Sequence, residues 1–173
     1  MSNTIVIYFS HSANDSSFAG VDARLKGNTQ IAVEAIQKEL SCDVFRVELS
    51  NKYDGMVWHT NRKKLKRTMR GKGLETKELL DNIDGYEYVF ICGPCWWCSY
   101  PTAIYAQMNR LNFRGKKVMC LVTHEGIRPD SCVTDARKKA KGARFGDSYI
   151  VRGDEVQQHL LQIARWAQLQ VAE

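Results

Sequence analysis

Two short groups of hydroxyl and amide side chains near the amino end of the chain could bind an anion. The first is Ser10-His11-Ser12, which follows an apolar run at Ile5–Phe9, and the second is Gly27-Asn28-Thr29. Apolar residues at helical spacing follow Thr29, so the second group marks a predicted helix N-terminus. Backbone N–H groups at such a terminus, together with hydroxyls, bind phosphate. Because serine, threonine and asparagine also cap helices without any ligand, a purely structural role is an alternative.

The surrounding sequence restricts the class of phosphate ligand. There is no G-x-x-x-x-G-K-[ST] run and no G-x-G-x-x-G after the first apolar run, so the triphosphate and dinucleotide motifs are missing. A hydroxyl-rich loop without a cation suits a phosphate monoester whose charge is met by backbone dipoles. Flavin mononucleotide (FMN) is a common ligand of this kind.

A second apolar run, Tyr88–Cys92, leads into Gly-Pro-Cys-Trp-Trp-Cys at residues 93–98, and Pro101 then stands where a helix begins. Two adjacent tryptophans on a strand-to-helix loop cannot both enter a core from consecutive positions. At least one should face the crevice at the carboxyl end of the sheet, where open α/β proteins bind their ligands. An indole in that crevice offers a stacking surface for a flat ring.

With these motifs the chain resembles the flavodoxin-like proteins, in the branch with a Ser-x-[Ser/Thr] … Gly-Asn-Thr phosphate loop and a Pro-x-Trp-Trp second loop. Asp84–Tyr88, Phe113–Lys117 and Thr123-His124 also match, so the similarity extends from Thr4 to about Arg165. The resemblance implies FMN as cofactor and three loops around it, without naming a catalytic residue or a metal ligand. The phosphate loop would be Ser10, His11, Ser12, Gly27, Asn28 and Thr29; the loop beside the flavin ring Pro94, Cys95, Trp96, Trp97 and Cys98; the third loop Thr123, His124, Glu125 and Gly126.

Two residues depart from the pattern of that branch. Cys98 and Glu125 stand where relatives usually carry glycine. Glycine permits positive φ and close approach of the backbone to a ligand. A Cβ at these positions could crowd the ring edge, so a member that has lost its flavin is an alternative.

The elements that would position these loops alternate along the chain. Strand patterns occupy Thr4–Ser10, Asp43–Leu49, Tyr88–Cys92, Lys117–Thr123 and Asp147–Val151, and helix patterns occupy Thr29–Leu40, a stretch near Leu74–Asn82, Pro101–Leu111, Ser131–Lys141 and the residues from Glu155. The alternation predicts an α/β fold, with a doubly wound parallel sheet and helices on both faces. The five-stranded order 2-1-3-4-5 is implied by the family resemblance.

Composition favours one flavodoxin-like domain over residues 1–173, since 173 residues at 44% hydrophobic can form a single core. No basic, apolar leader opens the sequence and no apolar run reaches membrane-spanning length, so we expect a cytoplasmic protein without a membrane partner. Six cysteines in such a protein are expected to be reduced thiols.

Seven cations and no acid lie between Arg62 and Lys72, and the net charge is +6. Such a run is often a solvated face, but it also suits docking of an acidic redox partner protein. Nucleic acid is disfavoured, because we find no recognition motif and no aromatic residues among the cations. The irregular stretches Ala13–Lys26 and Asn51–Gly73 could instead complete a site across a homodimer.

The cysteines suggest two rival chemistries. Cys92, Cys95 and Cys98 have a C-x2-C-x2-C spacing found in iron–sulfur proteins, although no fourth ligand follows nearby. Cys95 and Cys98 alone form a C-x-x-C pair between a strand and a helix, as in dithiol oxidoreductases. The sequence therefore predicts an FMN-binding oxidoreductase or electron-transfer protein. The alternatives are an NAD(P)H-dependent quinone or nitro reductase with FMN, and a flavin-free Cys95/Cys98 dithiol protein.

Overall fold

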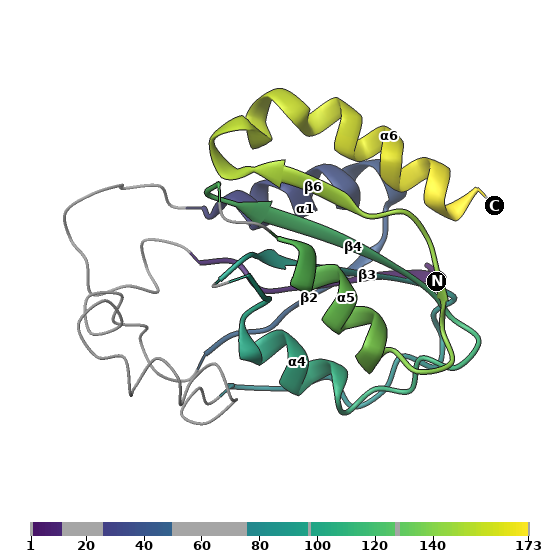
Figure 1. Ribbon diagram of the computed structural model, residues 1–173. Helices are drawn as coiled ribbons and strands as arrows, with labels where there is room; N and C mark the ends of the chain where they lie inside the picture. Colours follow the sequence, from purple (N-terminus) through teal and green to yellow (C-terminus); the bar gives the residue numbers. More distant parts are fainter. Residues whose placement is uncertain (1, 12–25, 50–75, 97, 127–128, 173) are drawn as a thin grey trace, which may run out of the picture.

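The computed structural model describes residues 2–11, 26–49, 76–96, 98–126 and 129–172. Its centre is a parallel sheet in the order β2-β1-β3-β4-β5, with β6 also pairing with β4 (Figure 1). The strands are β1 (Thr4–Tyr8), β2 (Asp43–Arg46), β3 (Tyr88–Pro94), β4 (Lys117–His124), β5 (Arg144–Phe145) and β6 (Tyr149–Arg152). The predicted α/β class, parallel sheet and strand order are confirmed.

Helices cover both faces of the sheet, as predicted (Figure 1). Helices α1 (Asn28–Leu40) and α6 (Leu160–Val171) pack on one face, and α4 (Thr102–Met108) and α5 (Asp130–Lys139) pack on the other. Neighbouring residues of β1 and β3 enter opposite clusters, so both faces of these strands are buried. This double burial explains why the strands appear in the sequence as continuous apolar runs.

The predicted helix near Leu74–Asn82 is wrong over its described part, because residues 77–82 contain no helix. Thr76 pairs with Leu49 as an antiparallel bridge, and the Lys77 N–H donates to the Glu48 carbonyl at 2.9 Å. Further on, the buried Gln107 amide accepts the Leu80 N–H at 2.7 Å and donates to the Leu80 carbonyl at 2.8 Å. These long-range bonds satisfy the backbone that a helix would otherwise have satisfied locally.

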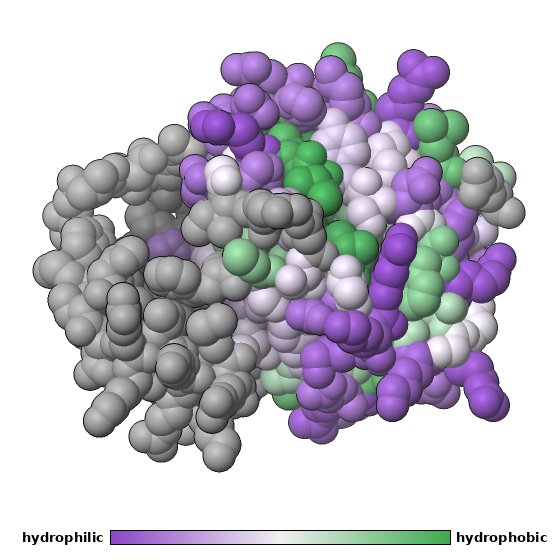
Figure 2. Space-filling view, in the orientation of Figure 1, coloured by the Kyte–Doolittle hydropathy of each residue, from purple (hydrophilic) through white to green (hydrophobic). Residues whose placement is uncertain are grey.

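The carboxyl-terminal elements differ from the prediction in their bounds. The fifth sheet position is divided between β5 and β6, of which β6 overlaps the predicted strand Asp147–Val151. The chain then forms a 3₁₀ helix, η2 (Gly153–His159), before α6 begins at Leu160, five residues later than predicted. On the face shown in Figure 2, polar and charged side chains cover much of the described part of the chain, with apolar groups in smaller patches between them. Within the described ranges, no helix combines the length and apolar character that crossing a membrane requires.

Candidate functional site

The three predicted loops meet at the carboxyl ends of β1, β3 and β4, which are neighbours in the sheet. A cavity of about 220 Å³ lies between them. It is lined by His11, Asn28, Thr29, Pro94, Cys95, Trp96, Thr123, His124 and Glu125, all of which the sequence assigns to the site. The predicted residues Ser12 and Trp97 lie outside the described residues, as do Arg62–Lys72. Residues far apart in the sequence thus surround one cavity, with the amino end of α1 at its wall.

Hydroxyl groups gather where α1 begins. Gly27 is the N-cap residue of α1, so Asn28 and Thr29 are its first two helical residues. A Cβ at Gly27 would collide with the His11 carbonyl and the Ser10 hydroxyl, so only glycine fits there. The Ser10 Oγ accepts the Gln30 N–H at 3.1 Å and satisfies one donor of the first helical turn. This turn and the hydroxyl beside it form the donor set of an anion site.

The Thr29 and Thr123 hydroxyls connect the phosphate loop to the end of β4. Their Oγ1 atoms are 2.8 Å apart and share a hydrogen bond. Both side chains are buried and line the cavity. The bond fixes the position of α1 relative to β4 and places a polar pair on the cavity wall.

A tight turn forms the loop after β3. The Cys95 N–H donates to the Thr123 carbonyl at 2.7 Å, which attaches the loop to β4. Trp96 and Ser99 then exchange two backbone hydrogen bonds of 2.7 and 3.1 Å, so Cys98 lies within the turn that these bonds close. Cys98 has φ of 67°, in the left-handed region that favours glycine. The cysteine at this position is therefore held in a backbone conformation that favours glycine, and its side chain is exposed.

Trp96 supplies an aromatic surface to the cavity. Its ring meets Phe9 edge-on, with ring centroids 5.3 Å apart, and meets His11 at 6.0 Å. The half-buried indole is thus held between a core residue and the phosphate loop. Of the two predicted tryptophans, Trp96 lies on the cavity wall, and Trp97 is outside the described residues.

The third loop carries a ring nitrogen and a carboxylate. The His124 Nδ1 accepts the Gly126 N–H at 3.0 Å, so this nitrogen carries no proton in the arrangement observed. The Glu125 Oε1 accepts from the Asn28 Nδ2 at 3.4 Å and connects the third loop to the phosphate loop. A Cβ at Gly153 would collide with both groups of that bridge. Gly153 is therefore part of the site, although no sequence motif marks it.

An ion pair joins the last residue of β6 to η2 near this loop. Arg152 donates to both carboxylate oxygens of Asp154, at 3.0 and 2.8 Å. These hydrogen bonds lower the pKa of Asp154 and raise that of Arg152. Both side chains are exposed, so the pair is a surface feature and does not add charge to the cavity wall.

The iron–sulfur alternative does not match the geometry. Cys92 is buried on the α1 and α6 side of the sheet, Cys95 belongs to the cluster on the opposite side, and Cys98 is exposed. Three sulfur atoms so placed do not converge on one cluster. Throughout the described part of the chain, no group of three or more histidine, cysteine, aspartate or glutamate residues could hold a metal ion.

The fold and the site define a doubly wound α/β protein with a ligand cavity at the carboxyl edge of its sheet. The flavodoxin family model matches residues 3–168, and the chain belongs to the flavodoxin family. Comparison with curated proteins gives no match.

Solved structures share the fold at low sequence identity. A Bacteroides uniformis protein described as a flavoprotein is 17% identical with a TM-score of 0.73, covering 96% of this chain and 98% of its own. A flavoprotein structure from Bacteroides eggerthii is 21% identical with a TM-score of 0.67, covering 93% and 97%. A Lactobacillus acidophilus flavoprotein, solved in complex with FMN, is 20% identical with a TM-score of 0.59, covering 91% and 98%.

Proposed function

We propose that the chain binds FMN in the cavity and acts as a flavin-dependent oxidoreductase or electron-transfer protein. The observation that carries the proposal is the convergence of all three predicted flavin loops on one cavity. One part of its wall is the hydroxyl-rich start of α1, and another part is the indole of Trp96. The FMN named with the Lactobacillus acidophilus structure supports the same cofactor.

The residues present suit FMN. The first turn of α1, with the Ser10 and Thr29 hydroxyls, supplies neutral donors for a phosphate monoester. Trp96 offers a flat surface for the flavin ring, which supplies the electron-accepting chemistry when bound. The chain's own contribution is to orient the cofactor, exclude water and set the local charge. Glu125 supplies a negative charge to the cavity wall. Its carboxylate accepts a hydrogen bond from the Asn28 side-chain amide, which keeps that amide in contact with the third loop.

A titration with FMN tests the proposal. Purified protein is mixed with FMN, and binding is followed by quenching of flavin fluorescence and by the visible absorption bands. We expect Asn28→Ala to weaken binding by about tenfold, since one hydrogen bond to a charged group contributes roughly 1.5 kcal/mol. Asn109→Ala is the matched control, because Asn109 is an exposed amide just past the end of α4, outside the cavity wall. Wild-type protein that leaves added FMN unchanged would refute the proposal.

The more specific proposal is electron transfer with an acidic partner protein. The net charge of +6 and the cations at Arg62–Lys72 support it, because opposite charge accelerates encounter. With FMN bound, the rate of reduction of anionic ferricyanide should fall as salt rises, and replacing Lys63 and Lys64 by glutamine should flatten that dependence. Rapid turnover of NAD(P)H with a quinone would instead favour the reductase.

A further inference from the structure

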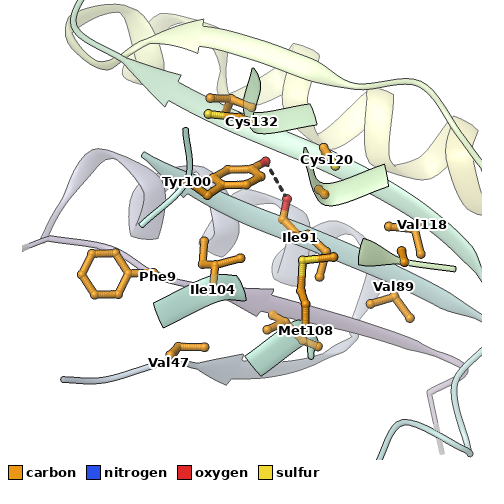
Figure 3. Packing of buried hydrophobic residues seen from close by; sticks show 14 of the residues in the cluster. Phe9, Val47, Val89, Ile91, Tyr100, Ile104, Met108, Val118, Cys120 and Cys132 are labelled. Carbon is orange, nitrogen blue, oxygen red and sulfur yellow. Dashed lines mark hydrogen bonds between the residues drawn. The ribbon is translucent and has the colours of Figure 1, made fainter. Parts of the chain in front are cut away.

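The turn after β3 is attached to the sheet at both of its ends. At its start, the Cys95 N–H donates to the Thr123 carbonyl at 2.7 Å. At its end, the Tyr100 side chain is buried in the core, and its hydroxyl donates to the carbonyls of Ile91 and Leu121 at 3.2 and 3.0 Å. Figure 3 shows this ring inside the buried cluster, with its bond to Ile91. The two attachments fix where the turn begins and ends.

One side chain outside the turn, Tyr105 of α4, restrains the second half of it. The Tyr105 hydroxyl and the Ser99 Oγ are 2.8 Å apart and share a hydrogen bond. The Tyr100 N–H donates to the same hydroxyl at 3.3 Å. Burial raises the pKa of Tyr105 to about 12, so the hydroxyl keeps its proton at neutral pH. A single hydroxyl on α4 therefore holds two consecutive residues of the turn.

Ser99 connects this hydroxyl to the cavity wall. It exchanges two backbone hydrogen bonds, of 2.7 and 3.1 Å, with Trp96, whose indole lines the cavity. The edge-on contact with Phe9 restrains the indole ring, whereas the directional bonds of the turn restrain the backbone that carries it. Tyr105 is not among the residues that line the cavity. It is therefore placed to affect a ligand through the turn and not by touching it.

We propose that Tyr105 is a positioning residue, whose hydroxyl holds the turn in the arrangement that presents the Trp96 indole to the ring of a bound flavin. The inference rests on the proposed function and deepens it, because it assigns recognition of the ring to a contact behind the cavity wall. The donors for a phosphate lie elsewhere, at the start of α1 beside Ser10. Different elements would thus hold the two ends of the ligand.

Amide hydrogen exchange, followed by NMR in the flavin-free protein, tests the restraint itself. In Tyr105→Phe, the Trp96 and Ser99 N–H groups should exchange about tenfold faster, because the turn loses the bonds that hold it closed. Tyr149→Phe is the matched control, since it removes a hydroxyl that bonds the His159 Nδ1 at 2.9 Å outside the cavity wall. It should leave both amides unchanged. Wild-type exchange of the two amides in Tyr105→Phe would overturn the proposal.

Parallel titrations with riboflavin and FMN test the effect on the ligand. Riboflavin has the flavin ring but no phosphate, so its affinity reports on the ring end of the site. Tyr105→Phe should weaken the binding of both ligands by the same factor, about five- to tenfold. Asn28→Ala, at the start of α1, should weaken only the binding of FMN, and Tyr149→Phe should weaken neither. A general loss of structure would not separate the two ends of the ligand in this way.

A double substitution tests whether Tyr105 acts through Trp96. In a Trp96→Leu background, Tyr105→Phe should no longer change the affinity for FMN, because the residue that it positions is gone. An undiminished effect in that background, or wild-type affinity for riboflavin in Tyr105→Phe alone, would overturn the inference and leave the proposed function standing. Wild-type protein that binds neither flavin would refute the proposed function, and the inference with it.

Discussion

Cys98 and Glu125 stand at the two positions where the family resemblance leads us to expect glycine, and the structure holds each of them in a different way. Cys98 adopts the left-handed backbone that glycine would adopt, at the exposed tip of a turn. Glu125 directs its carboxylate to Asn28, across the space that Gly153 leaves open. Neither residue removes the cavity, because Glu125 lines its wall and the Cys98 turn leaves Cys95 and Trp96 facing it.

The backbone of Cys98 predicts that glycine is the more stable residue there. A non-glycine residue in the left-handed region carries a strain of roughly 1–2 kcal/mol, which glycine avoids at some cost in chain entropy. We expect Cys98→Gly to raise the free energy of unfolding by about 0.5–1 kcal/mol, measured by urea denaturation. Cys98→Ala, which removes the thiol but keeps the Cβ, should leave stability unchanged within about 0.5 kcal/mol. Equal effects of the two substitutions would contradict the assigned strain.

The charge of Glu125 predicts an effect on the potential of a bound flavin. FMN gains negative charge on reduction, so a carboxylate on the cavity wall disfavours the reduced form. A unit charge at about 10 Å contributes roughly 1.7 kcal/mol at an effective dielectric of 20, and exposure and salt reduce it. We expect Glu125→Gln to make the reduction potential less negative by roughly 20–60 mV in a spectroelectrochemical titration. Glu39→Gln, an exposed acid at the far end of α1, should change it far less; a more negative potential in Glu125→Gln would exclude this role.

At the level of elements, the contact between Gln107 and the segment after residue 76 shows where sequence patterns fail. The spacing of apolar residues near Leu74–Asn82 predicts a helix, but residues 77–82 contain no helix. Gln107, on α4, makes both hydrogen bonds to Leu80 that the segment's own backbone would have made in a helix. A residue 27 positions away therefore decides the local structure, and no local pattern encodes that.

The same contact predicts that the protein loses much of its stability when the Gln107 side chain is replaced. Gln107→Met keeps the length of the side chain but removes both hydrogen bonds, leaving the Leu80 N–H and carbonyl unsatisfied in a partly buried setting. We expect the free energy of unfolding to fall by about 2–4 kcal/mol, by urea denaturation. The exposed Gln168→Met on α6 is the control and should change it by less than about 0.5 kcal/mol. A small effect of Gln107→Met would mean that water replaces the amide.

The strands that the sequence predicts most clearly share one property, which is burial along almost their whole length. The strands at Thr4–Tyr8, Tyr88–Pro94 and Lys117–His124 are buried along almost their whole length, and their apolar runs are unmistakable. The motifs that follow the carboxyl ends of these strands supply most of the residues that line the cavity. Gly153 could not be assigned in this way, since it contributes through its closeness to Asn28 and Glu125, which belong to distant segments.

At the scale of the whole molecule, thiols are built into both faces of the sheet. Cys42 and Cys92 lie on the α1 and α6 side, and Cys120 lies on the other. Burial raises the pKa of Cys42 to about 11 and of Cys120 to about 12, from 9.0, and raises that of Cys92 well above 9.0. The folded chain therefore holds these thiols neutral over a pH range in which the unfolded chain ionises them.

This difference predicts a loss of stability at alkaline pH. Because the folded-state pKa is raised, each thiol contributes fully below pH 9 and loses its contribution as pH rises towards 11 and 12. The loss is about 1.4 kcal/mol for each thiol at pH 10, or about 4 kcal/mol for the three, a large part of the stability of a typical domain. Urea denaturation at pH 8, 9 and 10 should show the free energy of unfolding decreasing more steeply with each step. In Cys42→Ala the free energy of unfolding should decrease between pH 8 and 10 by about 1.4 kcal/mol less than in the wild type. A decrease identical to that of the wild type would show that the Cys42 thiol ionises in the folded chain as it does in the unfolded chain.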